Sequence, residues 1–151
     1  MLHDMLRPLV AATLIALGGS SAAFAAATPV TVYKTATCGC CGEWVKHMRD
    51  AGFAVKTIDL EYPQLEAKRR QLGVPDAHAS CHTATVGGYL VEGHVPAASV
   101  RKLLAEKPAI VGLSVPGMEA NSPGMGEHKP GTLRVYRIER GQTQPKTYAL
   151  E

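Results

Sequence analysis

The four cysteines of this 151-residue chain are the residues best suited to chemistry, because three of them fall within four positions. They stand in the segment Cys38-Gly39-Cys40-Cys41, and Cys81 follows far downstream. Cys38 and Cys41 form a C-x-x-C pair, which is typical of thiol–disulfide redox sites. Redox chemistry does not explain the additional Cys40, so the same segment also indicates a metal site.

The cysteine segment lies between a predicted strand and a predicted helix. Residues 30–35 are β-branched and aromatic, and an apolar face with helical spacing begins at Glu43 and ends at Gly52. Trp44 and Met48 lie on that face and are predicted core residues. A helix N-terminus carries a partial positive charge, which favours thiolate over thiol. Because thiolates serve both metal binding and redox exchange, this position supports either interpretation.

The rest of the chain predicts a mixed sheet flanked by helices. Further helices are expected at residues 62–72 and 96–106, and further strands at 53–60, 81–86, 89–91, 133–138 and 146–150. Gly87-Gly88 suits a two-residue hairpin turn, whereas the first two strands need a crossover and should be parallel. This β-α-β-α-β-β-α order, followed by a glycine-rich loop over 114–131 and a C-terminal hairpin, predicts a thioredoxin-like α/β fold.

The predicted layout brings all four sulfurs together. Cys81 stands at the start of the third strand, where the chain should approach the cysteine-bearing helix start. Thioredoxin-like oxidoreductases carry a cis-proline just before that strand, but the nearest proline here is Pro75, six residues too early. Redox catalysis therefore leaves Cys40 and Cys81 idle. A purely structural role is also disfavoured. One long-range disulfide would stabilise the fold, but clustering three cysteines at one of its ends adds no further stability.

The charge of the cysteine group favours copper. Four thiolates carry a charge of −4, which cannot be buried without cations. Zn²⁺ prefers a tetrahedron built from two C-x-x-C pairs, which this spacing does not provide. Cu(I) is soft, takes two or three thiolates and allows each sulfur to bridge two ions. The N-terminal segment, described below, predicts export to an oxidising compartment, which disfavours an iron–sulfur cluster. Several Cu(I) ions are therefore expected, and zinc is the weaker alternative.

Imidazole and thioether side chains, which also suit copper, extend the list of predicted ligands. The candidates are His82, His94, Met118 and Met125. The other histidines are interpreted differently. We expect His47 to lie on the exposed helix face, paired with Glu43, and His128 to be a solvated loop residue. His78 is a loop histidine to which the sequence assigns no role.

The N-terminal segment predicts export. An apolar run follows Arg7, and Ala23-Phe24-Ala25 fits a signal peptidase site, so residues 1–25 are predicted to be a signal peptide. The run is short for a membrane span, although an uncleaved anchor is the alternative. Residues 26–151 then form one periplasmic domain that needs no membrane. The net charge of +3, without a dense basic stripe, argues against a nucleic-acid partner.

Five segments of the chain together resemble a known family. They are Tyr33-Lys34-x-x-x-Cys38-Gly39-Cys40-Cys41, Ser80-Cys81-His82-Thr83, Val86-Gly87-Gly88-Tyr89, Glu92-Gly93-His94-Val95-Pro96 and Val115-Pro116-Gly117-Met118. These segments resemble the CopG-type periplasmic copper-resistance proteins, and the match spans roughly residues 30–140. The chain departs from the family at Glu119, where relatives often have proline. The resemblance implies a thioredoxin-like fold, a multinuclear Cu(I)–thiolate cluster on the four cysteines and a role in copper tolerance.

Two functions stay open at this level. The leading hypothesis is a periplasmic protein that holds Cu(I) in copper tolerance, with copper or thiol redox activity as an open extension. Its expected partners are copper ions and either other periplasmic copper-handling proteins or a redox partner. The alternative hypothesis is a thiol–disulfide oxidoreductase that uses Cys38 and Cys41.

Overall fold

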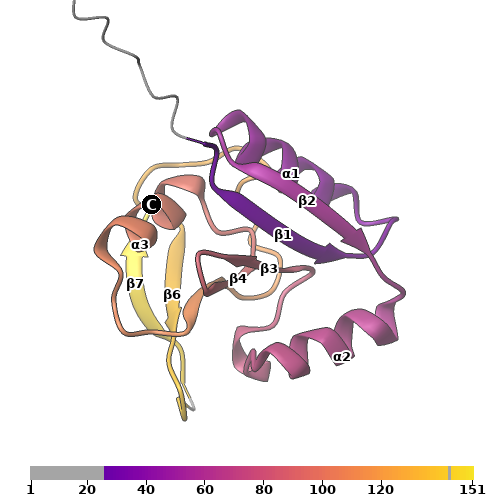
Figure 1. Ribbon diagram of the computed structural model, residues 1–151. Coiled ribbons are helices and arrows are strands. Elements are labelled where there is room, and N and C mark those ends of the chain that lie inside the picture. Colours follow the sequence, from indigo (N-terminus) through magenta and orange to yellow (C-terminus); the bar gives the residue numbers. More distant parts are fainter. Residues whose placement is uncertain (1–25, 143) are drawn as a thin grey trace, which may run out of the picture.

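The computed structural model describes residues 26–142 and 144–151, so the predicted signal peptide, residues 1–25, lies outside the described residues. Among the described residues there are three helices, α1 (Gly39–Asp50), α2 (Tyr62–Leu72) and α3 (Ala97–Glu106), together with a short 3₁₀ turn at Asp76–His78. The strands are β1 (Pro29–Lys34), β2 (Ala54–Asp59), β3 (Thr83–Val86), β4 (Tyr89–Gly93), β5 (Gly112–Val115), β6 (Arg134–Ile138) and β7 (Lys146–Leu150). Figure 1 shows their arrangement.

All seven strands join one mixed sheet in the order β2-β1-β3-β4-β5-β6-β7. The crossover through α1 makes β1 and β2 parallel, and the Gly87-Gly88 turn makes β3 and β4 antiparallel, as the sequence predicted. β4 and β5 are also parallel, because α3 connects them. The predicted mixed sheet, thioredoxin-like fold and C-terminal hairpin of β6 and β7 are confirmed.

The core lies mainly on the face of the sheet that α1 and α3 cover. Trp44 and Met48 of α1 join Val100 and Leu103 of α3 in one apolar cluster, which confirms the predicted role of both α1 residues. Helix α2 serves the other face, where its last residue, Leu72, packs against a smaller cluster that contains Leu90. The two helix layers therefore sandwich the strands that carry the site (Figure 1).

The sequence interpretation missed strand β5 and placed part of it in the loop 114–131. All four residues of β5 are buried, so the strand lacks the alternation that marks a half-exposed one. Gly112 is required there, because a Cβ atom would lie 2.0 Å from the carbonyl oxygen of Leu90. Strand β5 brings the loop that follows it next to the cysteines.

The start of α1 was also predicted wrongly, at Glu43 instead of Gly39. Cys38 is the N-cap, and its sulfur accepts a hydrogen bond from the backbone N–H of Cys41 at 3.3 Å. The sulfur thus takes the place of the oxygen that usually caps a helix. Cys40 and Cys41 consequently lie within the first helical turn, so their spacing follows helical geometry.

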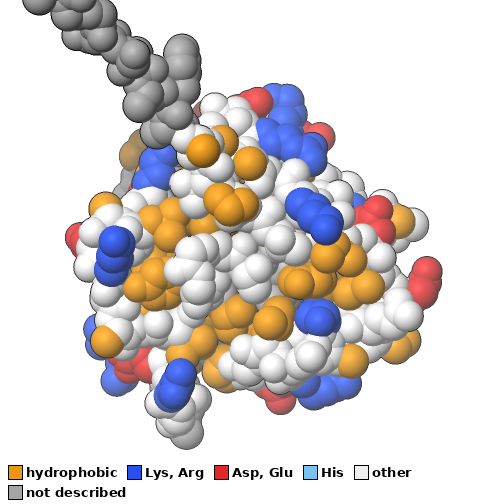
Figure 2. All heavy atoms as spheres, viewed as in Figure 1, with side chains coloured by type: hydrophobic (Ala, Val, Ile, Leu, Met, Phe, Trp, Pro, Cys, Tyr) orange, Lys and Arg blue, Asp and Glu red, His pale blue; other side chains and the backbone are white. Residues whose placement is uncertain are grey.

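The surface is of mixed character. Figure 2 shows Lys and Arg side chains scattered among apolar and neutral atoms on the face viewed, without a continuous basic stripe. None of the helices among residues 26–142 and 144–151 is long and apolar enough to cross a membrane.

Candidate metal centre

The four cysteine sulfurs lie together, and their Sγ atoms are all within 4.8 Å of one another. The sheet explains this convergence. Cys38 follows the end of β1, Cys81 precedes β3, and the antiparallel register pairs Tyr33 with Thr83 at that edge. The end of β1 therefore meets the beginning of β3, and the predicted convergence is confirmed.

The cysteines differ in their covalent state. Cys38 and Cys41 form a disulfide, whereas Cys40 and Cys81 are free. The sulfur of Cys40 lies 3.6 Å from that of Cys38. Cys41 is buried and the other three cysteines are partly exposed, so the group opens to solvent on one side. The described state is the oxidised one, in which two sulfurs can still act as thiolates.

His94 is the closest polar partner of Cys81. Its Nε2 atom lies 3.0 Å from the Cys81 sulfur, and its Nδ1 atom lies 2.7 Å from the carbonyl oxygen of Pro123. Because a carbonyl oxygen can only accept, Nδ1 carries the proton and Nε2 presents a lone pair to Cys81. The predicted ligand His94 is thus oriented toward the sulfur cluster.

Cys81 and His94 form a neutral pair in this state. Burial, with a contribution from Cys40, raises the pKa of the Cys81 thiol to about 11. Burial also lowers the pKa of His94. The Cys81 thiol therefore donates its proton to His94 Nε2, and a soft cation that replaces this proton would meet a thiolate and an imidazole lone pair together.

His82 completes a second group of candidate ligands with Cys81 and His94, whose ligand atoms also lie within 4.8 Å of one another. The ring of His82 is fully buried, 4.4 Å from the centroid of Trp44 and 5.0 Å from that of His94. Burial lowers the pKa of His82 to about 3, so the ring stays neutral. Its Nδ1 lies 3.7 Å from the Cys81 sulfur, and Nε2 has no hydrogen-bond partner among the described residues.

The glycine-rich loop passes next to the residues that carry the cysteines, with Gly117 at Ser80 and Gly124 at Cys40. Ser80 donates from its hydroxyl to the carbonyl oxygen of Gly117 at 2.5 Å. Gly124, with φ +87°, sits on the first turn of α1, where a Cβ atom would lie 2.8 Å from the carbonyl oxygen of Cys40. Met125 and Met118 follow Gly124 and Gly117 directly in the chain. Met125 is partly buried and Met118 is 63% exposed.

The remaining histidines, His47, His78 and His128, lie outside the two groups of candidate ligands. The prediction for His47 is wrong: it is half-buried, and its Nε2 accepts a hydrogen bond at 3.0 Å from the backbone N–H of Ala97, the first residue of α3. An unfilled donor at a helix start attracts such an acceptor. His78 is buried and lies 2.6 Å from the Ser114 hydroxyl, although the sequence assigned it no role. His128 is exposed, as predicted.

Sequence reasoning missed a buried charged pair behind Cys81. Arg69 of α2 donates from Nε to Glu92 of β4 at 2.8 Å, and the carboxylate of Glu92 is fully buried. Burial raises the pKa of Glu92, although hydrogen bonding to Thr83 and the charge of Arg69 oppose that rise. The available signal was that Arg69 stands four residues after Leu65, on the face of α2 that packs inward.

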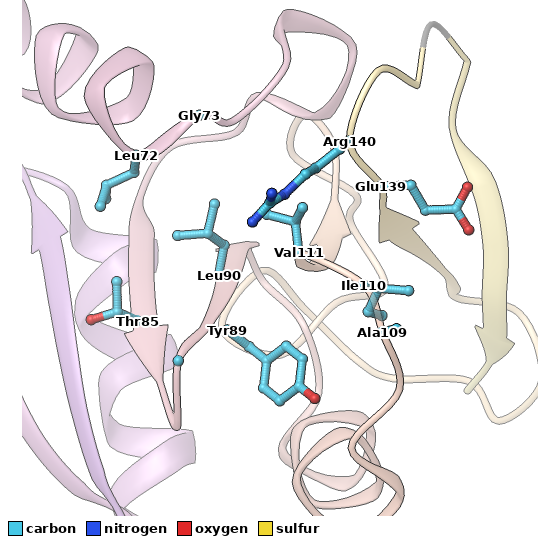
Figure 3. A pocket seen from close by; sticks show the side chains of 11 residues that line it. Leu72, Gly73, Thr85, Tyr89, Leu90, Ala109, Ile110, Val111, Glu139 and Arg140 are labelled. Atoms are coloured by element: carbon cyan, nitrogen blue, oxygen red, sulfur yellow. The ribbon is translucent and has the colours of Figure 1, made fainter.

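An open groove lies apart from the cysteines. It encloses about 940 Å³ between the end of α2 and the β6–β7 hairpin, and none of the four cysteines lines it. Figure 3 shows its apolar floor, which includes Leu90 and Val111, with Arg140 extending over it.

Comparison with solved structures identifies the family. The chain is 38% identical to "Copper resistance protein copG- Form 2", with a TM-score of 0.71, and the match covers 83% of this chain and 98% of that one. A second structure, "Copper resistance protein copG- Form 1", matches at 36% identity with a TM-score of 0.72 and the same coverage. This chain belongs to the CopG copper-resistance protein family.

The family model that matches this CopG-family chain is described as "Protein of unknown function, DUF411" and covers residues 78–125. That range holds Cys81, both predicted histidine ligands and both predicted methionine ligands, but not the cysteines of α1. A search of curated proteins found no match. The resemblance predicted from the sequence motifs is confirmed.

Proposed function

We propose that this chain is a periplasmic copper-binding protein that holds Cu(I) as a multinuclear thiolate cluster on Cys38, Cys40, Cys41 and Cys81, in the service of copper tolerance. The observation that carries the proposal is the convergence of the four sulfurs within 4.8 Å. The likeness to two structures named as copper resistance proteins supports it.

The donor set fits copper. Thiolates are soft ligands that bridge Cu(I) ions, and several monovalent ions neutralise four thiolates more fully than one divalent ion does. Cys40 and Cys41 are adjacent in one helical turn, which suits bridging better than a zinc tetrahedron. The buried Nε2 of His82, which has no partner among residues 26–142 and 144–151, is consistent with a ring that has a further role.

We propose further ligands and rank them by how close the structure places them to the cysteines. His94 comes first, because its Nε2 lone pair lies 3.0 Å from the Cys81 sulfur. His82 follows through its Nδ1, 3.7 Å from the same sulfur. Met125 and Met118 are proposed from the path of their loop past Cys40 and Ser80.

Copper ions are the substrate in this proposal. Other periplasmic copper-handling proteins supply or receive these ions, or a redox partner exchanges electrons with the site. The periplasmic location rests on the signal-peptide pattern of residues 1–25. Disulfide formation between Cys38 and Cys41 suits such an oxidising compartment.

The proposal is tested by offering equal concentrations of Cu(I) and Zn²⁺ to the reduced, metal-free chain under anaerobic conditions. We expect copper to remain bound after gel filtration and zinc to elute freely, because soft thiolates prefer Cu(I). Displacement of copper by zinc at equal concentration would contradict a copper function.

A thiol–disulfide oxidoreductase is the second candidate, and the Cys38–Cys41 disulfide favours it. An insulin-reduction assay on the metal-free chain separates the two functions. If thiol exchange is the function, turnover survives in a variant that carries both Cys40→Ser and Cys81→Ser. Under the copper proposal, the wild-type chain shows little turnover, and the double variant loses copper binding.

A further inference from the structure

Arg69 and Glu92 form a charged pair in the interior of the protein, outside the sulfur cluster. Glu92 is 0% exposed and Arg69 is 5% exposed. Besides Glu92, Arg69 pairs with Glu66, which lies at the surface side of α2. A buried ion pair adds little to stability compared with apolar residues of the same volume. Stability alone therefore does not explain why this pair is present, and a second role is expected.

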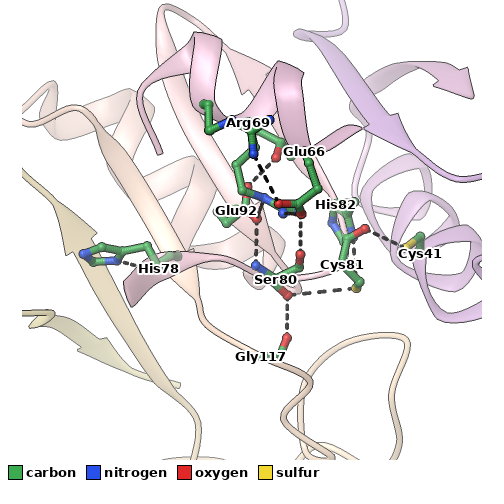
Figure 4. A network of polar contacts seen from close by, with 12 residues as sticks. Cys41, Glu66, Arg69, His78, Ser80, Cys81, His82, Glu92 and Gly117 are labelled. Atoms are coloured by element: carbon green, nitrogen blue, oxygen red, sulfur yellow. Dashed lines mark hydrogen bonds and ion pairs between the residues drawn. The ribbon is translucent and has the colours of Figure 1, made fainter. Parts of the chain in front are cut away.

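The pair holds the backbone on both sides of Cys81 and His82. The N–H of Ser80 donates to Glu92 Oε1 at 2.8 Å, and Arg69 Nη2 donates to the carbonyl oxygen of Ser80 at 2.5 Å. The hydroxyl of Thr83 donates to Glu92 Oε2 at 2.5 Å. One carboxylate therefore binds the residue before Cys81 and the residue after His82. Figure 4 shows the contact between Glu92 and Ser80.

These contacts supplement the backbone hydrogen bonds at this segment, where the carbonyl oxygen of His82 accepts from the N–H of Gly93 at 2.9 Å. Strand β3 begins only at Thr83, and Ser80 makes a single isolated bridge, to Gly117. The two residues between, Cys81 and His82, carry candidate ligand atoms but stand outside the regular ladder. Glu92 and Arg69 therefore add three side-chain contacts at Ser80 and Thr83 to the few backbone hydrogen bonds of this segment, and the position of the Cys81 sulfur is expected to depend in part on them.

We propose that Glu92 and Arg69 are positioning residues for the metal site: they clamp Ser80 and Thr83 so that Cys81 and His82 face the cysteines of α1. This inference rests on the proposed copper function and identifies residues that fix the positions of two of its candidate ligands, Cys81 and His82. Groups that orient metal ligands are worth about tenfold to hundredfold in metal affinity. The clamp therefore acts on copper binding without touching copper.

The test compares three variants by anaerobic Cu(I) titration against a chelator and by the thiolate-to-copper absorption band. Glu92→Ala removes the clamp, and we expect about tenfold to hundredfold weaker binding with an altered band. Glu92→Gln keeps an oxygen for the Ser80 N–H and an amide that can donate to the Thr83 hydroxyl, so it is expected to retain most of the affinity and the wild-type band. Glu66→Gln removes the charge of the other partner of Arg69 but leaves Ser80 held, and it should bind copper within about twofold of the wild type.

The outcomes separate the two proposals. A folded Glu92→Ala chain with wild-type affinity and band overturns the positioning role, as does an equal loss in Glu66→Gln. A Glu92→Gln chain as impaired as Glu92→Ala also overturns it, because the charge and not the clamp would then matter. If Glu92→Ala does not fold, Thr83→Val removes one contact of the clamp at nearly constant volume and should weaken binding severalfold; no change would overturn the proposal. A wild-type chain that binds no copper contradicts the proposed function itself.

Discussion

Replacement of Cys81 by serine is expected to lower the Cu(I) affinity of the reduced chain by about a hundredfold or more. Cys81 is the one cysteine of the four that does not come from the start of α1, so its loss leaves only the thiolates on that side of the site. Serine keeps the fold, because its hydroxyl can donate to His94 Nε2 as the thiol does. Competition with a Cu(I) chelator measures the affinity, and circular dichroism verifies the fold.

A matched control for this variant is Thr85→Ser, which changes β3 at a residue that lines the separate groove. It should bind copper as the wild type does. If the Cys81→Ser chain also matched the wild type in affinity and stoichiometry, Cys81 would not belong to the site, and the convergence of four sulfurs would have no functional meaning.

The second large effect concerns the disulfide. With Cys38 and Cys41 joined, only Cys40 and Cys81 remain as thiols, so the oxidised chain is expected to take up at most one Cu(I). Reduction consumes two electrons and two protons and converts the disulfide into two thiols. Uptake of two or more ions should then follow, and metal analysis after gel filtration measures it.

A variant with both Cys38→Ser and Cys41→Ser provides the control. It cannot form the disulfide, and its uptake should stay low whether or not reductant is present. Full copper loading of the oxidised wild-type chain would show that Cys38 and Cys41 are dispensable for binding.

The parts of the fold that depend on local patterns could be predicted from the sequence. The β-branched strand before the cysteines, the Gly87-Gly88 hairpin and the apolar face of α1 all follow from residue spacing. The convergence of Cys81 with the earlier cysteines was also predictable, because a thioredoxin-like order places β3 beside β1. The family followed from motifs, and the structural relatives confirm it.

The parts that depend on distant contacts were missed. Strand β5 is a strand because Gly112 lets it approach Leu90, and no local alternation marks it. His47 is held by the backbone N–H of Ala97, which lies far away along the chain. The pairing of Arg69 with Glu92 likewise joins α2 to β4; helical spacing from Leu65 indicates that Arg69 faces inward, but no local pattern identifies Glu92 as its partner.

The number of Cu(I) ions bound by the reduced, metal-free wild-type chain tests the central claim most directly. Titration under anaerobic conditions against a competing chelator gives this number and the affinity together. Four sulfurs that act as one site predict two or more tightly held Cu(I) ions per chain. Saturation at a single ion, or at none, would contradict the account.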